Sequence, residues 1–198
     1  SMDGLDLSFL RTDGKNFVKI FNGKSYNYSK SYKKKLKELI SKKSKKKLKE
    51  QINYYNLNED FITNEVISII KKFLSTINVK NKIDLISFSG QTVLHNPSKK
   101  ISLQLGSCKK IYQKFNIPVI GNFRKNDINL GGQGAPIGSY YHKYILNRFK
   151  KKTAIINLGG ISNITYIKKN KLSSFDLGPA NQLIDDLTYQ YCKKNYDK

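Results

Sequence analysis

The apolar segments of the chain fall into two successive runs, and this arrangement restricts the fold more than any other feature. In the first run, strand-like segments give way to helix-like segments that alternate with short apolar strands. After a basic joint at 150–152, three further strand-like segments follow one another, so the second run begins much as the first does. Helices alternating with strands are typical of α/β domains. The sequence therefore predicts two related α/β domains in tandem, with a boundary near 150–153.

Apolar periodicity and turn residues bound the expected elements. Strands are expected over 5–10, 16–28, 83–88, 101–105, 117–120, 154–158, 164–168 and 172–175. Helices are expected over 32–51, 61–77, 109–115, 139–149 and 182–191. The apolar run at 83–88 is typical of a strand buried on both faces. Two helices carry an apolar face, made of Ile62, Val66, Ile69, Ile70 and Phe73 in one and of Leu183, Ile184, Leu187 and Tyr191 in the other.

The net charge of +23 is the strongest compositional signal, and taken alone it suggests a polyanion as partner. The basic residues are almost all lysine, however, and nucleic-acid readers generally use arginine for bidentate contacts. The lysines of 33–49 alternate with apolar residues at helical spacing, which indicates an amphipathic helix with a solvated basic face. We therefore attribute the excess of lysine to the composition of an AT-rich genome, and we expect no specific nucleic-acid partner. A basic nucleic-acid-binding module is kept as the alternative.

The remaining composition narrows the class of protein further. The chain has no apolar stretch of membrane-spanning length and no signal-peptide pattern. We therefore expect a cytoplasmic protein without a membrane partner. Cys108 and Cys192 lack metal-ligand spacing, so both are expected to be free thiols.

Two glycine-containing loops are candidates for phosphate binding. The loop at 1–6 lies beside a strand, so its backbone N–H groups could face a phosphate and its aspartates could hold a hydrated Mg²⁺. The loop at 157–163 carries two glycines, which allow a sharp turn and the close approach of a ligand. It occupies the same place in the second run as the loop at 1–6 in the first, so the two could grip one phosphate chain. A disordered terminus and a simple hairpin turn are the respective alternatives.

A third loop, at 175–181, carries the candidate catalytic carboxylate. Asp176 is expected to follow a strand and to precede a helix, which is where α/β enzymes place catalytic groups. A carboxylate in this position could act as a general base. The alternative is that Asp176 or Asn181 caps the helix.

Two polar stretches, 89–95 and 122–136, are expected to form pocket walls. Each follows a buried strand, and the second runs into a glycine-rich loop at 131–138. Their glutamine and arginine side chains could hydrogen-bond the hydroxyl, amide or carboxylate groups of a sugar.

These stretches together resemble the anhydro-N-acetylmuramic acid kinase family over nearly the whole chain. The segments that carry the resemblance are SMDGLD at 1–6, SGQTVLH at 89–95, LQLG at 103–106, NFRKNDINLGGQGAP at 122–136, NLGGISN at 157–163 and FDLGPANQLID at 175–185. The resemblance implies an α/β fold of the actin-like ATPase (ribonuclease H-like) architecture, a mixed sheet flanked by helices. Residues 1–150 would be a first domain that lacks its first strand, and 151–198 the beginning of a second. It also implies a kinase of peptidoglycan recycling that uses ATP and Mg²⁺.

The family resemblance assigns a role to individual residues. Asp176 would be the base that activates water to open the 1,6-anhydro bridge of the sugar, whose O6 is then phosphorylated. Phosphate binding is assigned to Ser1, Met2, Asp3, Gly4, Gly159, Gly160, Ser162 and Asn163, with Asp3 also near the metal. The sugar pocket is assigned to Gln91, Arg124, Asp127 and Gln133. The expected partners are the anhydro-sugar and ATP, and a homodimer is left open.

The sequence departs from the family pattern at three positions. Ser89, Asn122 and Ala180 stand where the family usually has His, Asp and Gly, which leaves open a related sugar kinase of different specificity. The chain is also shorter than the family pattern, so we expect a fragment that is poorly stable and inactive alone. A non-catalytic remnant is the remaining alternative.

Overall fold

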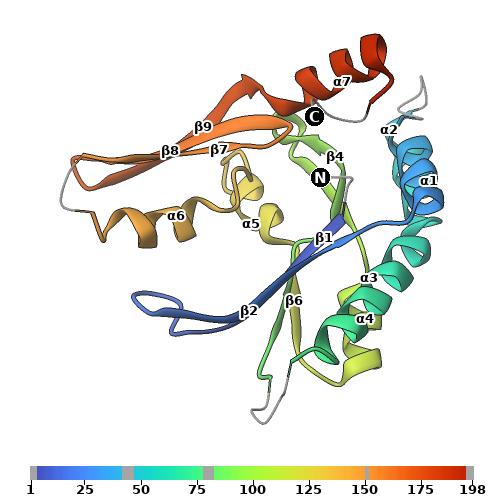
Figure 1. The fold of residues 1–198 in the computed structure, drawn as a ribbon, viewed down its shortest axis with the longest axis horizontal. Helices are drawn as coiled ribbons and strands as arrows, with labels where there is room; N and C mark the ends of the chain where they lie inside the picture. The colour runs from blue at the N-terminus through green and yellow to red at the C-terminus, as the bar shows by residue number, and fades with distance from the viewer. Residues whose placement is uncertain (1–3, 42–46, 78–82, 150–151, 195–198) are drawn as a thin grey trace. The chain divides into compact units, whose positions relative to one another are not determined.

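The computed structural model describes residues 4–41, 47–77, 83–149 and 152–194 (Figure 1). The chain divides into two compact units, a first unit over 2–134 and a second unit over 135–198. Each contains helices and strands, so the α/β class predicted from the sequence is confirmed. None of the helices within these described ranges has both the length and the apolar character needed to cross a membrane.

The first unit begins with a long two-stranded ribbon. Strands β1 (Gly4–Thr12) and β2 (Val18–Asn27) were both predicted, and they pair antiparallel with a bulge between Phe9 and Leu10 (Figure 1). The Asp13 carboxylate organises the connecting turn, because its Oδ1 accepts hydrogen bonds of 2.9 Å from the backbone N–H groups of residues 15, 16 and 17. These bonds favour the charged carboxylate and therefore lower the pKa of Asp13.

Three helices follow the ribbon: α1 (Lys30–Ser41), α2 (Leu48–Asn56) and α3 (Glu59–Leu74). The single helix predicted over 32–51 is wrong, since α1 and α2 are separate elements. Lys47, which precedes α2, has a non-helical ψ of 147°, and residues 42–46 lie outside the described residues. The predicted apolar face of α3 is confirmed, because all five of its residues are at most 5% exposed.

The remaining elements of the first unit are short. Strand β3 (Ile86–Phe88) pairs parallel with β6 (Val119–Gly121), and β4 (Gln91–Asn96) pairs antiparallel with β5 (Ile101–Leu105). The 3-10 turn η1 (Pro97–Lys99) connects β4 to β5, while α4 (Cys108–Phe115) and α5 (Phe123–Asn129) flank β6 in the chain. The prediction that 83–88 is buried on both faces is wrong, since Leu85 is 45% exposed. Strand β4 and helix α5 were not predicted.

A hydrophobic core holds the first unit together. Leu36 of α1, Leu105 of β5 and Ile111 of α4 are all 0% exposed and belong to one cluster. A buried hydroxyl complements this packing. Thr63 of α3 donates to the backbone carbonyl of Glu59 and accepts a 3.0 Å bond from the backbone N–H of Ser107, which ties α3 to the start of α4.

The second unit is a three-stranded antiparallel meander with two helices. Strands β7 (Ala154–Leu158), β8 (Ile161–Lys168) and β9 (Lys171–Pro179) pair in that order, between α6 (Ser139–Leu146) and α7 (Asn181–Cys192) in the chain. The His142 Nδ1 atom of α6 lies 2.8 Å from Thr165 Oγ1, which lies 2.8 Å from Ser174 Oγ. This network attaches α6 to β8 and β9 within the second unit, whereas the domain boundary expected near 150–153 stays a prediction.

Helix α7 carries its apolar stripe on an open surface. The four residues of the stripe are between 45% and 75% exposed, and no described residue of α7 is buried. The helix was predicted correctly from its periodicity, which reports an amphipathic face and not the burial of that face.

Candidate functional site

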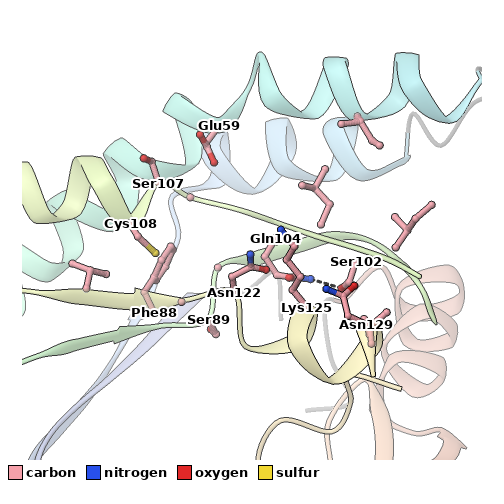
Figure 2. A pocket seen from close by; sticks show the side chains of 18 of the residues that line it. Glu59, Phe88, Ser89, Ser102, Gln104, Ser107, Cys108, Asn122, Lys125 and Asn129 are labelled. Atoms are coloured by element: carbon pink, nitrogen blue, oxygen red, sulfur yellow. Dashed lines mark hydrogen bonds between the residues drawn. The ribbon is translucent and has the colours of Figure 1, made fainter. Parts of the chain in front are cut away.

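A cavity of about 710 Å³ opens in the first unit among β5, α5 and the start of α4 (Figure 2). Figure 2 shows the α5 side chains Lys125 and Asn129 beside the β5 side chains Ser102 and Gln104. Ser89 and Asn122 also line the cavity, and Phe88 and Cys108 form an apolar part of its wall. The lining therefore combines neutral hydrogen-bonding groups with the charged side chains of Lys100, Lys125 and Glu59, which suits a small polar ligand.

Gln104 leaves one acceptor of the cavity unsatisfied. Its Nε2 atom donates a 2.7 Å hydrogen bond to Ser102 Oγ, and Ser102 Oγ lies 3.0 Å from His95 Nδ1. The Oε1 atom of Gln104 is buried and has no hydrogen-bond donor among the residues that the structure describes. A buried acceptor without a donor costs free energy, so this part of the wall is locally destabilised.

Cys108 is a structural part of the cavity wall. Burial raises the pKa of its thiol, which disfavours the reactive thiolate. Its Sγ atom lies so close to Gly121 that a Cβ on that glycine would be 2.7 Å from the sulfur. Cys108 and Cys192 are both free, as predicted.

The glycine-rich loop that follows α5 is bound to that helix. Asp127 Oδ2 accepts a 2.6 Å hydrogen bond from the backbone N–H of Gly134, and Arg124 Nη1 donates a 2.6 Å bond to the carbonyl oxygen of the same glycine. Gly134 is buried and has a φ of +66°, while the side chain of Gln133 is exposed.

None of the four predicted sugar-binding residues lines the cavity. Two of them contact the loop instead, and Gln91 lies half-buried in β4.

In the second unit, the Gly159–Gly160 turn joins β7 to β8 and holds the start of α7. The backbone N–H groups of Ala180 and Asn181 donate to the carbonyl oxygens of Gly160 and Gly159, at 2.9 and 3.0 Å. Neither glycine has a left-handed φ, and a Cβ on either would make contacts no closer than 3.4 Å. Neither backbone conformation nor crowding within the chain therefore demands glycine at these two positions.

Helix α7 begins without a side-chain cap. Its N-cap residue is Ala180, and no side-chain capping bond is present there. Asn181 donates from Nδ2 to the carbonyl oxygen of Leu158 at 3.1 Å, so its amide serves the turn. Helix capping by Asp176 or Asn181 is thus wrong.

Asp176 lies inside β9 and not beyond its end, since the strand continues to Pro179. It pairs in register with Asn163 of β8, which in turn pairs with Asn157 of β7. Directly opposed residues share one face of a sheet, so the three polar side chains form a row across it. The Asp176 side chain is exposed. The row therefore presents a solvent-accessible carboxylate next to two amides.

A bulge follows this row. The pairing shifts between Ser162 and Asn163, which leaves Leu177 as an extra residue between the partners Asp176 and Gly178. The hydroxyl of Ser162 is buried and donates a 3.0 Å bond to the carbonyl oxygen of Gly178. Ser162, predicted as a phosphate ligand, thus contributes its hydroxyl to the bulge.

The family model for anhydro-N-acetylmuramic acid kinase matches residues 1–198. The chain belongs to this family. It is 37% identical over 207 residues to the anhydro-N-acetylmuramic acid kinase of Pelagibacter ubique, covering 100% of the chain and 54% of that protein. The proteins of the same name from Bradyrhizobium diazoefficiens and Zymomonas mobilis are 32% and 34% identical, and 55% and 56% of their lengths are covered. The chain spans about half the length of the curated relatives it matches.

For this member of the anhydro-N-acetylmuramic acid kinase family, the structure places some predicted residues and not others. Ser1, Met2 and Asp3 lie outside the described residues. Gly4 begins β1, where a Cβ would overlap the carbonyl oxygen of Tyr26. Within the described ranges, no three or more His, Cys, Asp or Glu side chains group into a metal site. The joint action of the loops at 1–6 and 157–163 stays a prediction.

Sequence reasoning missed the cavity side chains of Gln104, Lys125 and Asn129. The signal that could have found those of α5 is spacing, because residues 122, 125 and 129 follow one another at three and four positions along a helix. Two of the three departures from the family pattern, Ser89 and Asn122, line the same cavity. Asn122 adopts a left-handed φ of +61°, which asparagine tolerates better than most residues.

Proposed function

We propose that the protein is an ATP-dependent anhydro-N-acetylmuramic acid kinase acting in peptidoglycan recycling in the cytoplasm. It opens the 1,6-anhydro bridge with water and phosphorylates O6, giving N-acetylmuramic acid 6-phosphate. The match of the family model over 1–198 supports this proposal, as do relatives that bear the same name. We further propose an actin-like architecture, with 1–150 as the first domain and 151–198 as the beginning of the second.

The exposed carboxylate in the row Asn157–Asn163–Asp176 carries the proposal. Asp176 takes a proton from the attacking water while the water oxygen bonds to C1 of the sugar. The bond between C1 and O6 breaks, and O6 takes the γ-phosphoryl group of ATP, so that ADP leaves. The amide of Asn163, directly across the strand pair, is placed to orient the carboxylate or the bound phosphate. This chemistry depends on positioning and on neutralisation of charge.

The Gly159–Gly160 turn supports nucleotide binding. Since the chain itself does not require glycine at either position, the absence of side chains serves the close approach of a phosphate. We propose that Gly159, Gly160, Ser162 and Asn163 bind phosphate, and that Ser1, Met2, Asp3 and Gly4 bind phosphate as well. Asp3 would hold Mg²⁺, which when bound neutralises charge on the transferred group.

The cavity of the first unit is the proposed sugar site. The hydroxyl and amide side chains of its lining, among them Ser102 and Asn129, suit the hydroxyl and amide groups of a sugar, and Lys125 suits a carboxylate. Gln91, Arg124, Asp127 and Gln133 remain the proposed residues of substrate binding from the motif, Arg124 and Asp127 through their contacts with the glycine-rich loop. A related sugar kinase of different specificity is the second candidate, because Ser89 and Asn122 both line this cavity.

The test uses the full-length protein with ATP, anhydro-N-acetylmuramic acid and water labelled with ¹⁸O. The expected product carries one ¹⁸O atom at C1 and a phosphoryl group on O6, and plain N-acetylhexosamines are not phosphorylated. Asp176→Asn is expected to abolish turnover, whereas Asp186→Asn on α7 of the same unit serves as the matched control and keeps it. Unlabelled product, or full activity of Asp176→Asn, would overturn the proposal.

A further inference from the structure

Helix α5 stands between the cavity and the glycine-rich loop and presents different residues to each. Asn122, Lys125 and Asn129 line the cavity, while Arg124 and Asp127 hydrogen-bond the loop. Ile128 does both, since it lines the cavity and would touch a Cβ on Gly134. The position of the loop is therefore fixed relative to the cavity wall through one short helix.

The two loop contacts converge on a single residue, Gly134. Asp127 accepts from the N–H of Gly134 and Arg124 donates to its carbonyl oxygen, both at 2.6 Å. Both bonds involve a charged side chain, and such bonds are stronger than neutral ones. Gly134 has a left-handed φ, and a Cβ there would lie 2.7 Å from Ile128 Cδ1. Gly134 is thus held at both its N–H and its carbonyl group, in a conformation that glycine adopts at little cost.

The loop also wraps around the carboxylate of Asp127. The N–H of Gly132 donates a 2.8 Å bond to the backbone carbonyl of Asp127, and a Cβ on Gly132 would overlap both carboxylate oxygens. The residue between these two glycines is Gln133, whose side chain is exposed. Gly132 and Gly134 therefore fix the backbone on either side of Gln133.

We propose that Asp127, together with Arg124, is a positioning residue that holds the loop so that Gln133 contacts the sugar. This inference rests on the proposed function, because it assigns a route by which Asp127 serves substrate binding. Asp127 acts through the loop, and Gln133 is the loop side chain that reaches the ligand.

A structural readout tests the clamp without any activity measurement. Amide hydrogen exchange at Gly134 in the full-length protein is expected to quicken at least about fivefold in Asp127→Ala, from loss of a charge-assisted bond. Gly132→Ala is expected to have the same effect, since its methyl group displaces the carboxylate. The double variant should exchange no faster than either single variant, because both remove one interaction. Gly23→Ala in β2, where a Cβ finds its nearest contact at 3.5 Å, is the matched control.

Kinetics of the same full-length variants test the route to the substrate. Gln133→Ala is expected to raise KM for the sugar about tenfold in the wild-type background and to have little further effect in Asp127→Ala. Additive effects would mean that Asp127 contacts the sugar itself, and unchanged Gly134 exchange in Asp127→Ala would mean that no clamp exists. Either result overturns the inference while wild-type turnover stands. Failure of the proposed function shows differently, as a wild-type protein without turnover whose Gly134 exchange still responds to Asp127→Ala.

Discussion

The two units bury different kinds of residue. The first unit has a hydrophobic core in which α1, α3, α4 and β5 pack together, with Leu36, Leu105 and Ile111 fully buried. Among the described residues of the second unit, only Leu146, Ser162 and Thr165 are buried, and two of these are polar. The first unit thus depends on apolar burial, whereas the second depends on strand pairing and on a network of hydroxyl and imidazole groups.

This difference bears on how each unit tolerates substitution. Apolar burial is non-directional and scales with the area removed from water, so a deletion in a packed core is costly. A buried hydroxyl network is directional, and it loses most when one partner is left without another. The units should therefore respond to different changes.

Leu36→Ala is expected to have the largest effect on stability. The fully buried leucine would leave a cavity, and such deletions cost about 2–5 kcal/mol in the free energy of unfolding. Denaturant unfolding measures the change. Leu183→Ala on α7, where the side chain is 55% exposed, is the control and should cost about 1 kcal/mol or less. Equal losses for the two variants would contradict the contrast between the units.

Thr165→Val tests the second unit. The change keeps the shape of the side chain but leaves His142 and Ser174 without their shared hydroxyl, at a cost of about 1–3 kcal/mol in the free energy of unfolding. Thr165→Ser keeps the hydroxyl and should cost less. Urea unfolding followed by the ring signals of His142 in NMR spectra reports on this network directly. If valine proved as stable as serine, the network would not stabilise the unit.

Alkaline pH should affect the first unit before the second. Burial raises the pKa of Tyr28 and Tyr32 above the ordinary value of 10.0, because the charged phenolate is poorly solvated there. Their folded-state pKa values are raised, so their contribution to the free energy of unfolding is complete below pH 10. This contribution declines as the pH rises toward the folded-state pKa values. Unfolding of the first unit measured between pH 8 and 11 should show this decline. Tyr32→Phe should reduce the slope, and an unchanged slope would exclude the tyrosine as its cause.

The smallest expected effect is local, at the tip of the β1–β2 ribbon. The pKa of Asp13 is lowered by three backbone hydrogen bonds, so the stability it gives the turn is present above the ordinary value of 3.8 and is lost as the pH falls through the lowered value. An NMR titration of the carboxyl group should show this lowered pKa, and Asp13→Asn should remove the transition. No change in the rest of the first unit is expected, since the residue is exposed.

Periodic segments were the predictable part of this fold. The buried face of α3 and the strands β1, β2, β5 and β7 to β9 follow from apolar spacing, because burial of one face imposes that spacing. Strand β4 and helix α5 were not predicted, because their residues are mostly polar and tertiary context decides their conformation. The lysine-rich segment was predicted as one helix, whereas the structure has the two helices α1 and α2.

The candidate site divides in the same way. Motif residues such as Asp176 and Asn163 could be named from the sequence, but their opposition across two strands depends on register, which a single sequence does not reveal. The contacts of Arg124 and Asp127 with Gly134 were equally hidden, because polar side chains beside a glycine-rich loop suit a ligand and a loop contact alike. The sequence thus identified the residues that carry reactive groups, and the structure identified the residues that they pair with or contact.

The bulge at Leu177 has a consequence for how such proteins diverge. An extra residue places Asp176 and Gly178, two apart in the chain, on opposite sides of β9. Loss of a single residue between 171 and 175, with the turn at 169–170 unchanged, would turn the carboxylate to the reverse side of the sheet while the residues around it kept their sequence. Single-residue deletions in this strand should therefore be far rarer among active relatives than substitutions, since strand phase, more than residue identity, decides where the acid group faces.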